Sequence, residues 1–488
     1  MHIPFIEEFS IESLLVLVYV IDILIAVTVV FLEHKNPSAT LAWIMILFLL
    51  PGVGIVLYFL LSQNIAKKKL FRLTQREKEI VEELLYNQTE LVKRDQFRYL
   101  KADTAAWKDL ILLNQNYSKA LLTQNNSITM LTDGNHMFES LIADIEAAKT
   151  YINLEFFIVK NDVAGQRLLN VLTKKAREGV TVRFLMDAMG SRFMTHKVMA
   201  PFKEAGGRYA FFFPPRFRGI NLKFNYRNHR KIVIIDDKIG YLGGYNIARE
   251  YLDKKRKFGH WRDTHLRVEG NSIRNISARF VQDWRFASHE QISIEAAYAA
   301  EVPAPGDTAV QIVSSGPDSL RQEIKHAYLR MITGAQKNIY IQSPYFVPDN
   351  TIFDALQNAA LSGVDVRIMI PCMPDHMFVY WATYYYCGLL LRSGVKVYIY
   401  DNGFLHAKTI AVDGAVCSVG SANFDIRSYR LNFETNAFIF DEDETYKLEA
   451  IFEEDMAESH ELTRSLYAQR SLWIKFKEGI AKLLSDLL

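Results

Sequence analysis

HRKIVIID, residues 229–236, and HAKTIAVD, residues 406–413, share one skeleton, H-x-K-x4-D, which therefore occurs twice in a chain of 488 residues. Each copy is followed by a turn of small residues that ends in asparagine, GGYN at 243–246 and GSAN at 420–423. One copy of so short a pattern is only a hypothesis. Two copies with matching extensions are not expected by chance, so the chain carries a repeated unit that bears a functional site.

The apolar run inside each motif predicts its local structure. Ile232–Ile235 and Thr409–Val412 are almost wholly apolar and rich in β-branched residues, which is typical of a buried strand. A histidine and a lysine two residues apart on a strand point to the same face. The alternative, an ordinary core strand with incidental charges, accounts for one copy but not for both.

The residue types suit phosphodiester chemistry. A neutral imidazole can attack phosphorus, and an imidazolium can protonate the leaving oxygen. A lysine ammonium stabilises the charge that develops on the nonbridging oxygens. An aspartate can fix the tautomer of an imidazole, as in hydrolase triads. The predicted catalytic residues are His229, Lys231, Asp236, His406, Lys408 and Asp413.

An internal duplication surrounds the motifs and predicts the fold class. Similar strand patterns recur in the same order in both halves: Ser127–Gly134 with Val310–Gly316, Tyr151–Phe157 with Ile339–Tyr345, and Gly179–Arg183 with Gly363–Arg367. Helical stretches separate these strands. We therefore expect an α/β protein with two repeated lobes, each a mixed sheet with helices on both faces.

The N-terminus predicts a membrane anchor within residues 1–62. Residues 14–32 are apolar except for Asp22, and residues 41–61 carry no charge. A bilayer-spanning helix needs about 20 such residues, so two transmembrane segments are expected. Pro51 and Gly52 would kink the second segment or make it a re-entrant element. A cleaved signal peptide is disfavoured because no basic residues precede the first segment.

The charges beyond the second segment predict the orientation. Lys67–Lys69 and Arg72 follow it directly, which places the catalytic body on the cytoplasmic side. Residues 63–122 are predicted to be a solvated helical connector, residues 123–300 the first lobe and residues 301–488 the second lobe. The amphipathic stretch 473–484 docks either on the membrane or on the body, and its sequence fits both.

Composition limits the partners. The net charge is only +2, which does not indicate nucleic-acid binding. Basic and aromatic residues alternate between 211 and 231, a mixture that suits an anionic membrane surface, although a solvated basic face with core aromatics has the same pattern. The three cysteines show no CxxC spacing and indicate a reducing compartment. Neither motif contains a cluster of metal ligands, so no metal and no cofactor is expected.

The residues around the motifs resemble a known family. The relevant segments are Asn225–Lys231, Gly243–Tyr251, Trp261–Asp263, Asn423–Ser428 and Asn432–Glu434. From about Asn126 to the C-terminus the chain resembles the phospholipase D superfamily and, within it, the bacterial cardiolipin synthases. The resemblance implies that both motifs build one active site in a multi-pass protein of the bacterial cell membrane.

The resemblance also implies an activity and supporting residues. The activity is transfer of a phosphatidyl group from one phosphatidylglycerol to another through a phosphatidyl-histidine, with His229 as the nucleophile. Glu250 and Glu434 are expected either to orient the histidines or to be structural. The supporting or phosphate-binding residues are Asn246, Ser421, Asn423, Glu250 and Glu434.

Four other functions use or retain the same motifs. A hydrolytic phospholipase D or a phosphatidylserine synthase would take water or serine as the acceptor. A nuclease is disfavoured by the predicted membrane anchor and the balanced charge. A membrane scaffold without activity is disfavoured because it would not need two intact motifs.

Overall fold

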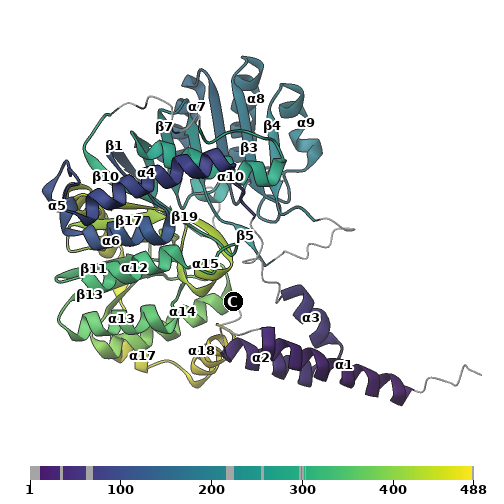
Figure 1. Ribbon diagram of the computed structural model, residues 1–488. Coiled ribbons are helices and arrows are strands. Elements are labelled where there is room, and N and C mark those ends of the chain that lie inside the picture. Colours follow the sequence, from purple (N-terminus) through teal and green to yellow (C-terminus); the bar gives the residue numbers. More distant parts are fainter. Residues whose placement is uncertain are drawn as a thin grey trace, which may run out of the picture. The chain divides into compact units, whose positions relative to one another are not determined.

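The computed structural model (Figure 1) describes residues 11–32, 37–61, 70–215, 225–253, 258–295, 298, 302 and 304–485 of the chain. The chain forms two compact units. One comprises Met1–Ile65 with Leu483–Leu488, and the other comprises Ala66–Lys482. The larger unit carries both motifs.

The smaller unit is helical. It consists of α1 (Ile11–Leu32), α2 (Pro37–Leu49) and α3 (Val53–Leu61). Trp43 and Leu47 of α2 are buried, and Trp43 packs edge-on against Tyr58 with ring centroids 5.4 Å apart. None of the helices in the described part of the chain combines the length and the apolar character that crossing a membrane requires.

The stretch predicted as the second membrane segment, residues 41–61, is not one helix. α2 ends at Leu49, and the chain turns through Pro51 and Gly52 before α3 begins. Pro51 has no N–H to continue the helix, and Gly52 adopts a φ of +77°, which glycine tolerates. The Gly52 N–H instead donates to the Asp22 carboxylate of α1 at 3.3 Å. The predicted kink is confirmed, and a continuous helix over 41–61 is wrong.

The predicted connector is helical. Its helices are α4 (Gln75–Lys93), α5 (Ala102–Ala106), α6 (Lys108–Leu113) and the π-turn η1 (Asn114–Ser118). α4 is exposed on one face and packs on the body of the larger unit through the other. Thr74 and Glu77 form a capping box that begins α4. Glu77 is buried and accepts a hydrogen bond from Arg285 at 2.9 Å, so α4 is fastened to the body of the larger unit.

A 16-stranded sheet organises the larger unit. Its strands from the first half are β1 (Leu122–Leu131), β2 (Tyr151–Phe156), β3 (Thr181–Asp187), β4 (Arg208–Phe212), β5 (Arg227–Asn228), β6 (Ile232–Ile235), β7 (Ile239–Gly243) and β9 (His265–Glu269). Those from the second half are β10 (Thr308–Ser315), β11 (Asn338–Gln342), β13 (Asp365–Pro371), β14 (Lys396–Tyr400), β16 (Thr409–Val412), β17 (Val416–Gly420), β19 (Asn432–Phe440) and β20 (Ser459–Glu461).

The two halves of the sheet repeat one strand order. Outward from the central pair, the first half reads β1-β9-β7-β6-β2-β3-β4 and the second reads β10-β19-β17-β16-β11-β13-β14. In both halves three strands are parallel (β2-β3-β4 and β11-β13-β14) and the motif strand is antiparallel to its neighbour. β1 joins the halves, since Leu122 and Thr123 pair with β10 whereas residues 127–131 pair with β9. The predicted mixed α/β fold is confirmed.

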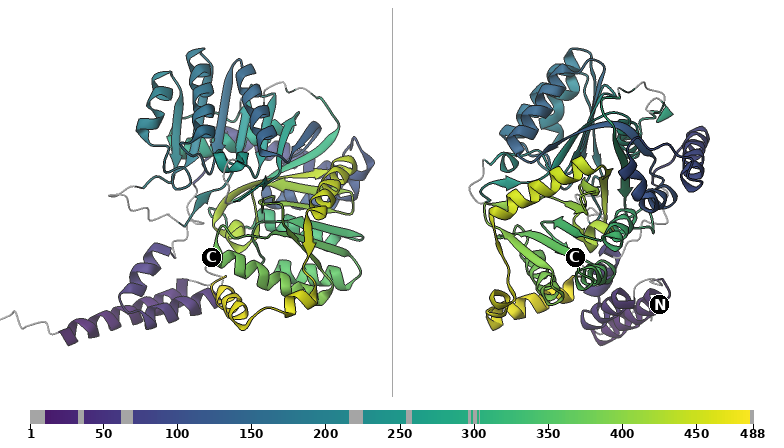
Figure 2. Two further views of the ribbon diagram at one scale, coloured as in Figure 1. Left: turned by 180° about the vertical axis from the view of Figure 1, so that it is seen from behind. Right: turned by 90° about the vertical axis from the view of Figure 1, so that its left-hand side faces the viewer.

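Helices cover the sheet, as the additional views in Figure 2 show. Several begin at an aspartate whose carboxylate accepts a backbone N–H; these caps are Asp133, Asp162, Asp349 and Asp441. The helices are α7 (Gly134–Ala147), α8 (Val163–Arg177), α9 (His196–Glu204), η2 (Arg249–Leu252), α10 (Ser272–Ser288), α12 (Glu323–Gly334), α13 (Asn350–Leu361), α14 (Met377–Leu390), η3 (Leu391–Ser393), α15 (Ile426–Arg430), α16 (Glu442–Ala457), α17 (Arg464–Ala468) and α18 (Leu472–Leu484).

Two short parallel pairings cross between the halves. β5 pairs with β19, with Asn228 opposite Phe433. β8 (Trp261–Arg262) pairs with β15 (Phe404–Leu405), with Arg262 opposite Leu405. In each case the next residue on one strand is a motif histidine and the next on the other is an acid. The crossings therefore set the geometry of the site.

Candidate active site

The motif strands separate the functional side chains by face. β6 and β16 are buried throughout, as predicted. Lys231 Nζ donates to the His229 carbonyl at 2.6 Å, so the lysine folds back toward its own histidine. Arg230 points to the opposite face, where it donates to both oxygens of Asp283 on α10 at 2.9 Å. The alternation of an extended chain thus keeps His229 and Lys231 together and assigns Arg230 to the core.

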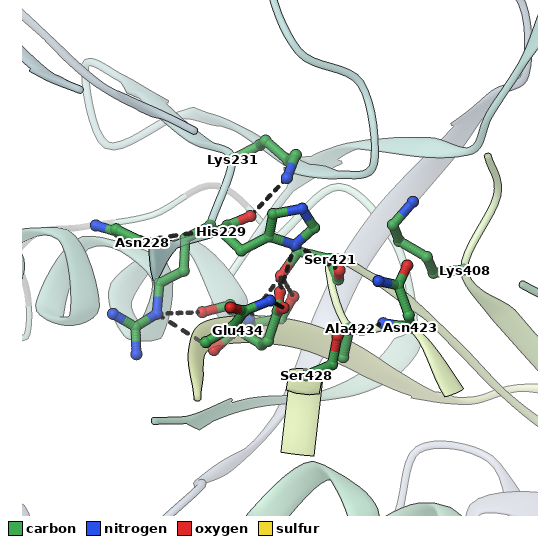
Figure 3. A network of polar contacts seen from close by, with 12 residues as sticks. Asn228, His229, Lys231, Lys408, Ser421, Ala422, Asn423, Ser428 and Glu434 are labelled. Carbon is green, nitrogen blue, oxygen red and sulfur yellow. Dashed lines mark hydrogen bonds and ion pairs between the residues drawn. The ribbon is translucent and has the colours of Figure 1, made fainter. Parts of the chain in front are cut away.

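His229 is held by the second half of the chain. Its backbone N–H donates to the Phe433 carbonyl at 2.9 Å, which continues the β5–β19 pairing. Its Nδ1 then lies 3.0 Å from Glu434 Oε2 and 3.1 Å from the Ser421 carbonyl (Figure 3). The Ser421 hydroxyl donates to the same carboxylate oxygen. Glu434 is fully buried, so its position is fixed.

His406 is held in the same way by the first half. Its backbone N–H donates to the Arg262 carbonyl at 2.7 Å, and its Nδ1 lies 2.6 Å from Asp263 Oδ2. Asp263 is fully buried, and its Oδ1 accepts the Thr264 N–H at 2.8 Å. Each histidine therefore takes its carboxylate from the opposite half, across 205 residues for His229 and 143 for His406.

The carboxylates favour one tautomer of both rings. Because a carboxylate accepts hydrogen bonds, Glu434 and Asp263 favour a proton on Nδ1 and a lone pair on Nε2; at His406 the Lys408 ammonium also lies 2.9 Å from Nδ1. Burial acts to raise the pKa of Glu434, but His229 and Lys231 outweigh it and hold this pKa below its usual value. The pKa of Asp263 is lowered against burial in the same way, chiefly by Lys408 and His406. Both acids are therefore ionised, and both Nε2 atoms are free to act as a nucleophile or base.

The two lysines form an anion-binding site beside the histidines. Figure 3 shows Lys231 and Lys408 on the side of the His229 ring that faces away from Glu434. Burial lowers the pKa of Lys231 to about 7 and that of Lys408 to about 8. Burial likewise lowers the pKa of His229, and it lowers that of His406 to about 4. A bound phosphodiester supplies the negative charge that these groups lack, and so favours their protonated forms.

The motif aspartates are not partners of the histidines, contrary to the prediction. Asp236 accepts the backbone N–H groups of Lys149, Thr150 and Tyr151 at 2.7–2.9 Å. Asp413 makes the equivalent three bonds to Gln336, Lys337 and Asn338. Each aspartate lies at the far end of its strand, in a turn with positive φ, and fastens the loop that precedes the neighbouring strand.

Of the predicted supporting residues, some lie beside the motif histidines and lysines and others bond elsewhere in the fold. Ser421 and Glu434 contact His229. Asn423 donates to Asp425 at 3.2 Å, and Figure 3 shows it beside Lys408. Asn246 instead accepts the Ile158 N–H at 3.0 Å and donates to Tyr251. Glu250 forms an ion pair with Lys160 at 2.5 Å, and the carboxylate at His406 is Asp263.

Asp263 was missed as a partner of histidine, although a signal existed. β9 and β19 occupy equivalent places in the repeated sheet. Asp263-Thr264 precedes β9, and Glu434-Thr435 lies in β19, so an acid followed by threonine recurs at equivalent positions. Glu250 and Glu434 are found when the repeats are aligned through the residues that follow Asn246 and Asn423. Aligning the repeats through β9 and β19 instead places Asp263 opposite Glu434 and identifies it as the carboxylate partner of His406.

One group outside the motifs has the spacing of metal ligands. Among the described residues, Asp133, Asp253 and His260 hold ligand atoms within 4.8 Å of one another. These atoms already have structural roles, because Asp133 caps α7 and Asp253 accepts the Trp261 N–H at 2.7 Å. The group contains no motif residue.

Comparison with known proteins identifies the class. Residues 141–284 and 328–456 match the family described as "Cardiolipin synthase, PLD-like domain", and residues 20–63 match "Phospholipase_D-nuclease N-terminal". The crystal structure of phosphatidylserine synthase from Haemophilus influenzae has the same fold, with a TM-score of 0.59 over 78% of this chain and 100% of that chain at 16% identity.

Similarity to curated relatives narrows the class. The chain is 47% identical over 476 residues to a cardiolipin synthase of Listeria innocua, covering 97% of this chain and 99% of the relative. It is 47% identical over 481 residues to the major cardiolipin synthase ClsA of Bacillus subtilis, covering 98% and 100%. The chain belongs to the cardiolipin synthase family of the phospholipase D superfamily.

The lysine pKa values predict how substrate affinity depends on pH. In the empty site Lys231 and Lys408 lose their charge as the pH rises through about 7 and about 8. Above these values, binding a singly charged phosphodiester requires proton uptake. We therefore expect its KM to rise with pH by up to about tenfold per pH unit for each lysine. Initial rates between pH 6 and 9 would measure this.

Two variants test the assignment. Lys231→Arg keeps its charge throughout this range, so it should move the onset of the rise to higher pH. Lys238→Met removes an exposed lysine of the same strand region and should leave the profile unchanged. A KM that is constant between pH 6.5 and 8.5 in the unmodified enzyme would contradict the prediction.

Proposed function

We propose that this protein is a cardiolipin synthase that transfers a phosphatidyl group from one phosphatidylglycerol to another, releasing glycerol. One observation carries the proposal: two imidazoles from opposite halves, each held at Nδ1 by a buried carboxylate, stand with Lys231 and Lys408 in one site. The relatives named cardiolipin synthase, which match almost the whole chain, support the choice of substrate. The enzyme is a phosphatidyltransferase.

In the first step, His229 Nε2 attacks the phosphorus of phosphatidylglycerol, and the bond to glycerol breaks. The glycerol oxygen takes the proton of His406 Nε2, which leaves His406 neutral. Glu434 stabilises the positive charge on His229, and both lysines stabilise the nonbridging oxygens. For this step His406 must first gain a proton. The anionic substrate favours that, because it offsets the charge of Lys408, which together with burial lowers the His406 pKa.

In the second step, His406 removes a proton from a hydroxyl of another phosphatidylglycerol. The resulting oxygen attacks the phosphatidyl-enzyme, the bond from phosphorus to His229 breaks, and cardiolipin leaves. Two phosphodiesters of similar energy are exchanged, so the reaction needs no nucleotide. Neither step requires a metal ion or another cofactor.

We also propose that residues 1–62 anchor the enzyme in the bacterial cell membrane as two passes, with the catalytic body in the cytoplasm. Large apolar side chains are exposed along these helices, which is unusual on a water-facing surface; they include Leu15, Val16, Leu24, Val27, Leu41, Phe48 and Val53. The match to the phospholipase D N-terminal family over residues 20–63 supports an N-terminal module. Lys67–Lys69 support the orientation.

For the rest of the chain we propose the division predicted from the sequence: a connector at 63–122, a first lobe at 123–300 and a second lobe at 301–488. The repeated strand order of the sheet supports it, since β1 begins the first series and β10 begins the second.

The activity is tested with purified enzyme and phosphatidylglycerol labelled in its glycerol headgroup. Labelled glycerol and cardiolipin should appear together, and added unlabelled glycerol should suppress cardiolipin by returning the intermediate to phosphatidylglycerol. Phosphatidic acid as the main product would assign a hydrolase, and transfer to added serine would assign a phosphatidylserine synthase. Cardiolipin output that is indifferent to glycerol would contradict the mechanism.

The roles of the histidines predict different covalent adducts. Either His→Ala change should lower the rate by several orders of magnitude, because the two residues act as one unit. His406→Ala keeps the nucleophile, so a donor with a good leaving group should still phosphatidylate His229. His229→Ala should form no adduct. Mass spectrometry after acid quench distinguishes the variants, and an adduct on His406 in His229→Ala would reverse the roles.

The anchor is tested with topology reporters. Fusions at Ser38 and at Gln63 should report opposite sides of the membrane, with Gln63 in the cytoplasm. If both report the cytoplasmic side, the segment over residues 41–61 is re-entrant and the two-pass proposal fails.

A further inference from the structure

The C-terminal amphipathic helix α18 packs on the catalytic body through one face. Ala481 is fully buried in a cluster with Val347 and with Ala382 of α14. The Lys477 ammonium lies 4.1 Å from the centre of the Trp381 ring. Arg470, just before α18, forms a 2.7 Å ion pair with Glu478. Docking on the body, one of two placements that the sequence left open, therefore uses only part of the helix.

The opposite face of α18 is apolar and exposed. Leu472 is 83% exposed, Trp473 64% and Phe476 55%. The rings of Trp473 and Phe476 stack with centroids 5.5 Å apart and form a flat apolar surface. Side chains of this size, grouped on one helix face, usually mark an interaction surface.

The first turn of α14 carries exposed apolar side chains at the same end of the helix pair as the first turn of α18. Lys477 contacts Trp381, and Lys482 lies 5.2 Å from the Tyr385 ring, so the two helices run in the same direction. Their N-terminal turns therefore lie at the same end. Met377 and Phe378 begin α14 and are each 54% exposed. We call Met377, Phe378, Leu472, Trp473 and Phe476, with the basic residues of α18, the α14–α18 face.

The charges on α18 are positive wherever they are exposed. Lys475 and Lys482 are exposed, and Lys477 is half-buried. The acidic residue of the helix, Glu478, is buried and neutralised by Arg470. An apolar face flanked by lysines matches an anionic lipid surface, in which apolar side chains insert between headgroups and the ammonium groups meet phosphates.

The α14–α18 face adjoins the active site. Asp375, two residues before α14, accepts a hydrogen bond from Tyr345. Burial lowers the pKa of Lys408, and Asp375 is one of the carboxylates close enough to oppose that shift. β12 (Phe346–Val347), which contributes Val347 to the cluster under α18, pairs with β18 (Phe424–Asp425) directly after Asn423.

We propose that the α14–α18 face docks the catalytic body on the anionic bilayer surface, with the active site opening at the level of the lipid headgroups. This contact is separate from the anchor at residues 1–62 and goes beyond the proposed function. It gives a phosphodiester substrate a short path from the membrane to Lys408. A second copy of the chain is a poorer occupant, because self-association would bring like-charged lysines together.

An environment-sensitive fluorophore tests the docking in the full-length enzyme. Trp473→Cys and, separately, Phe476→Cys are labelled in a chain in which the half-buried Cys372 is replaced by serine. In phosphatidylglycerol vesicles we expect both labels to brighten about threefold and to be quenched by brominated acyl chains. A label at Leu361→Cys, which is 70% exposed on α13, is the matched control and should do neither.

The lipid charge and the lysines form the second arm of the test. The Trp473 label should respond more weakly in phosphatidylcholine vesicles. Lys475→Gln with Lys482→Gln should lower the inserted fraction in phosphatidylglycerol vesicles about tenfold, whereas Lys238→Gln should not. If the labels at 473 and 476 behave like the label at 361, the proposal is overturned. It is equally overturned if the labels respond to protein concentration in lipid-free detergent, which would assign the face to a second copy.

A measurement of activity links docking to turnover. Trp473→Glu with Phe476→Glu should lower cardiolipin formation from vesicles at least about tenfold. Activity on dispersed short-chain phosphatidylglycerol, which needs no bilayer contact, should stay within about twofold. Equal losses on both substrates would overturn the proposal. The fluorescence measurements do not depend on catalysis. If the enzyme makes no cardiolipin, the proposed function is refuted, but the fluorescence result still tests the docking.

Discussion

The active site depends on two parallel strand pairs of two residues each, β5 with β19 and β8 with β15. Each pair ends where a histidine of one half meets an acid of the other: His229 meets Glu434, and His406 meets Asp263. Backbone hydrogen bonds of 2.9 and 2.7 Å continue both pairings into the histidines themselves. Among the described residues, each motif histidine finds its carboxylate in the other half, so the site exists only when the halves are joined.

Burying several charged side chains in the site costs stability. The same desolvation favours binding of an anionic substrate, whose charge offsets the cost. Desolvation lowers the pKa of Lys231 and Lys408 far below the usual value for lysine. The neighbouring carboxylates, among them Glu434 and Asp263, offset only part of this desolvation cost before an anion enters. The negative charge of a bound phosphodiester offsets the energetic cost of burying the two ammonium groups. The additional negative charge that develops on the nonbridging oxygens in the transition state offsets it further. Glu434 and Asp263, ionised and fully buried, hold the two rings without needing to move during the reaction.

The motif aspartates illustrate how a repeated pattern can be structural. Asp236 and Asp413 each accept three backbone N–H groups from the loop before the neighbouring strand. Such a loop has unsatisfied donors, and a carboxylate fixed at the end of a buried strand satisfies them. The lysine and the aspartate of one motif therefore act at opposite ends of the strand. If every residue of the motif is taken to be catalytic, the aspartate is wrongly placed beside the histidine, at the active-site end of the strand.

The sequence by itself determined the elements and the chemistry. Apolar β-branched runs at 232–235 and 409–412 specify buried strands, and the two-residue spacing of His and Lys puts them on one face. Pro51 and Gly52 specify the break between α2 and α3. These are local effects, set by backbone sterics and side-chain alternation. Tertiary structure alone decided that Asp263 rather than Glu250 reaches His406, and that one face of α18 packs while the other stays exposed. Those choices depend on strand pairings between residues far apart in the chain, which no local preference specifies.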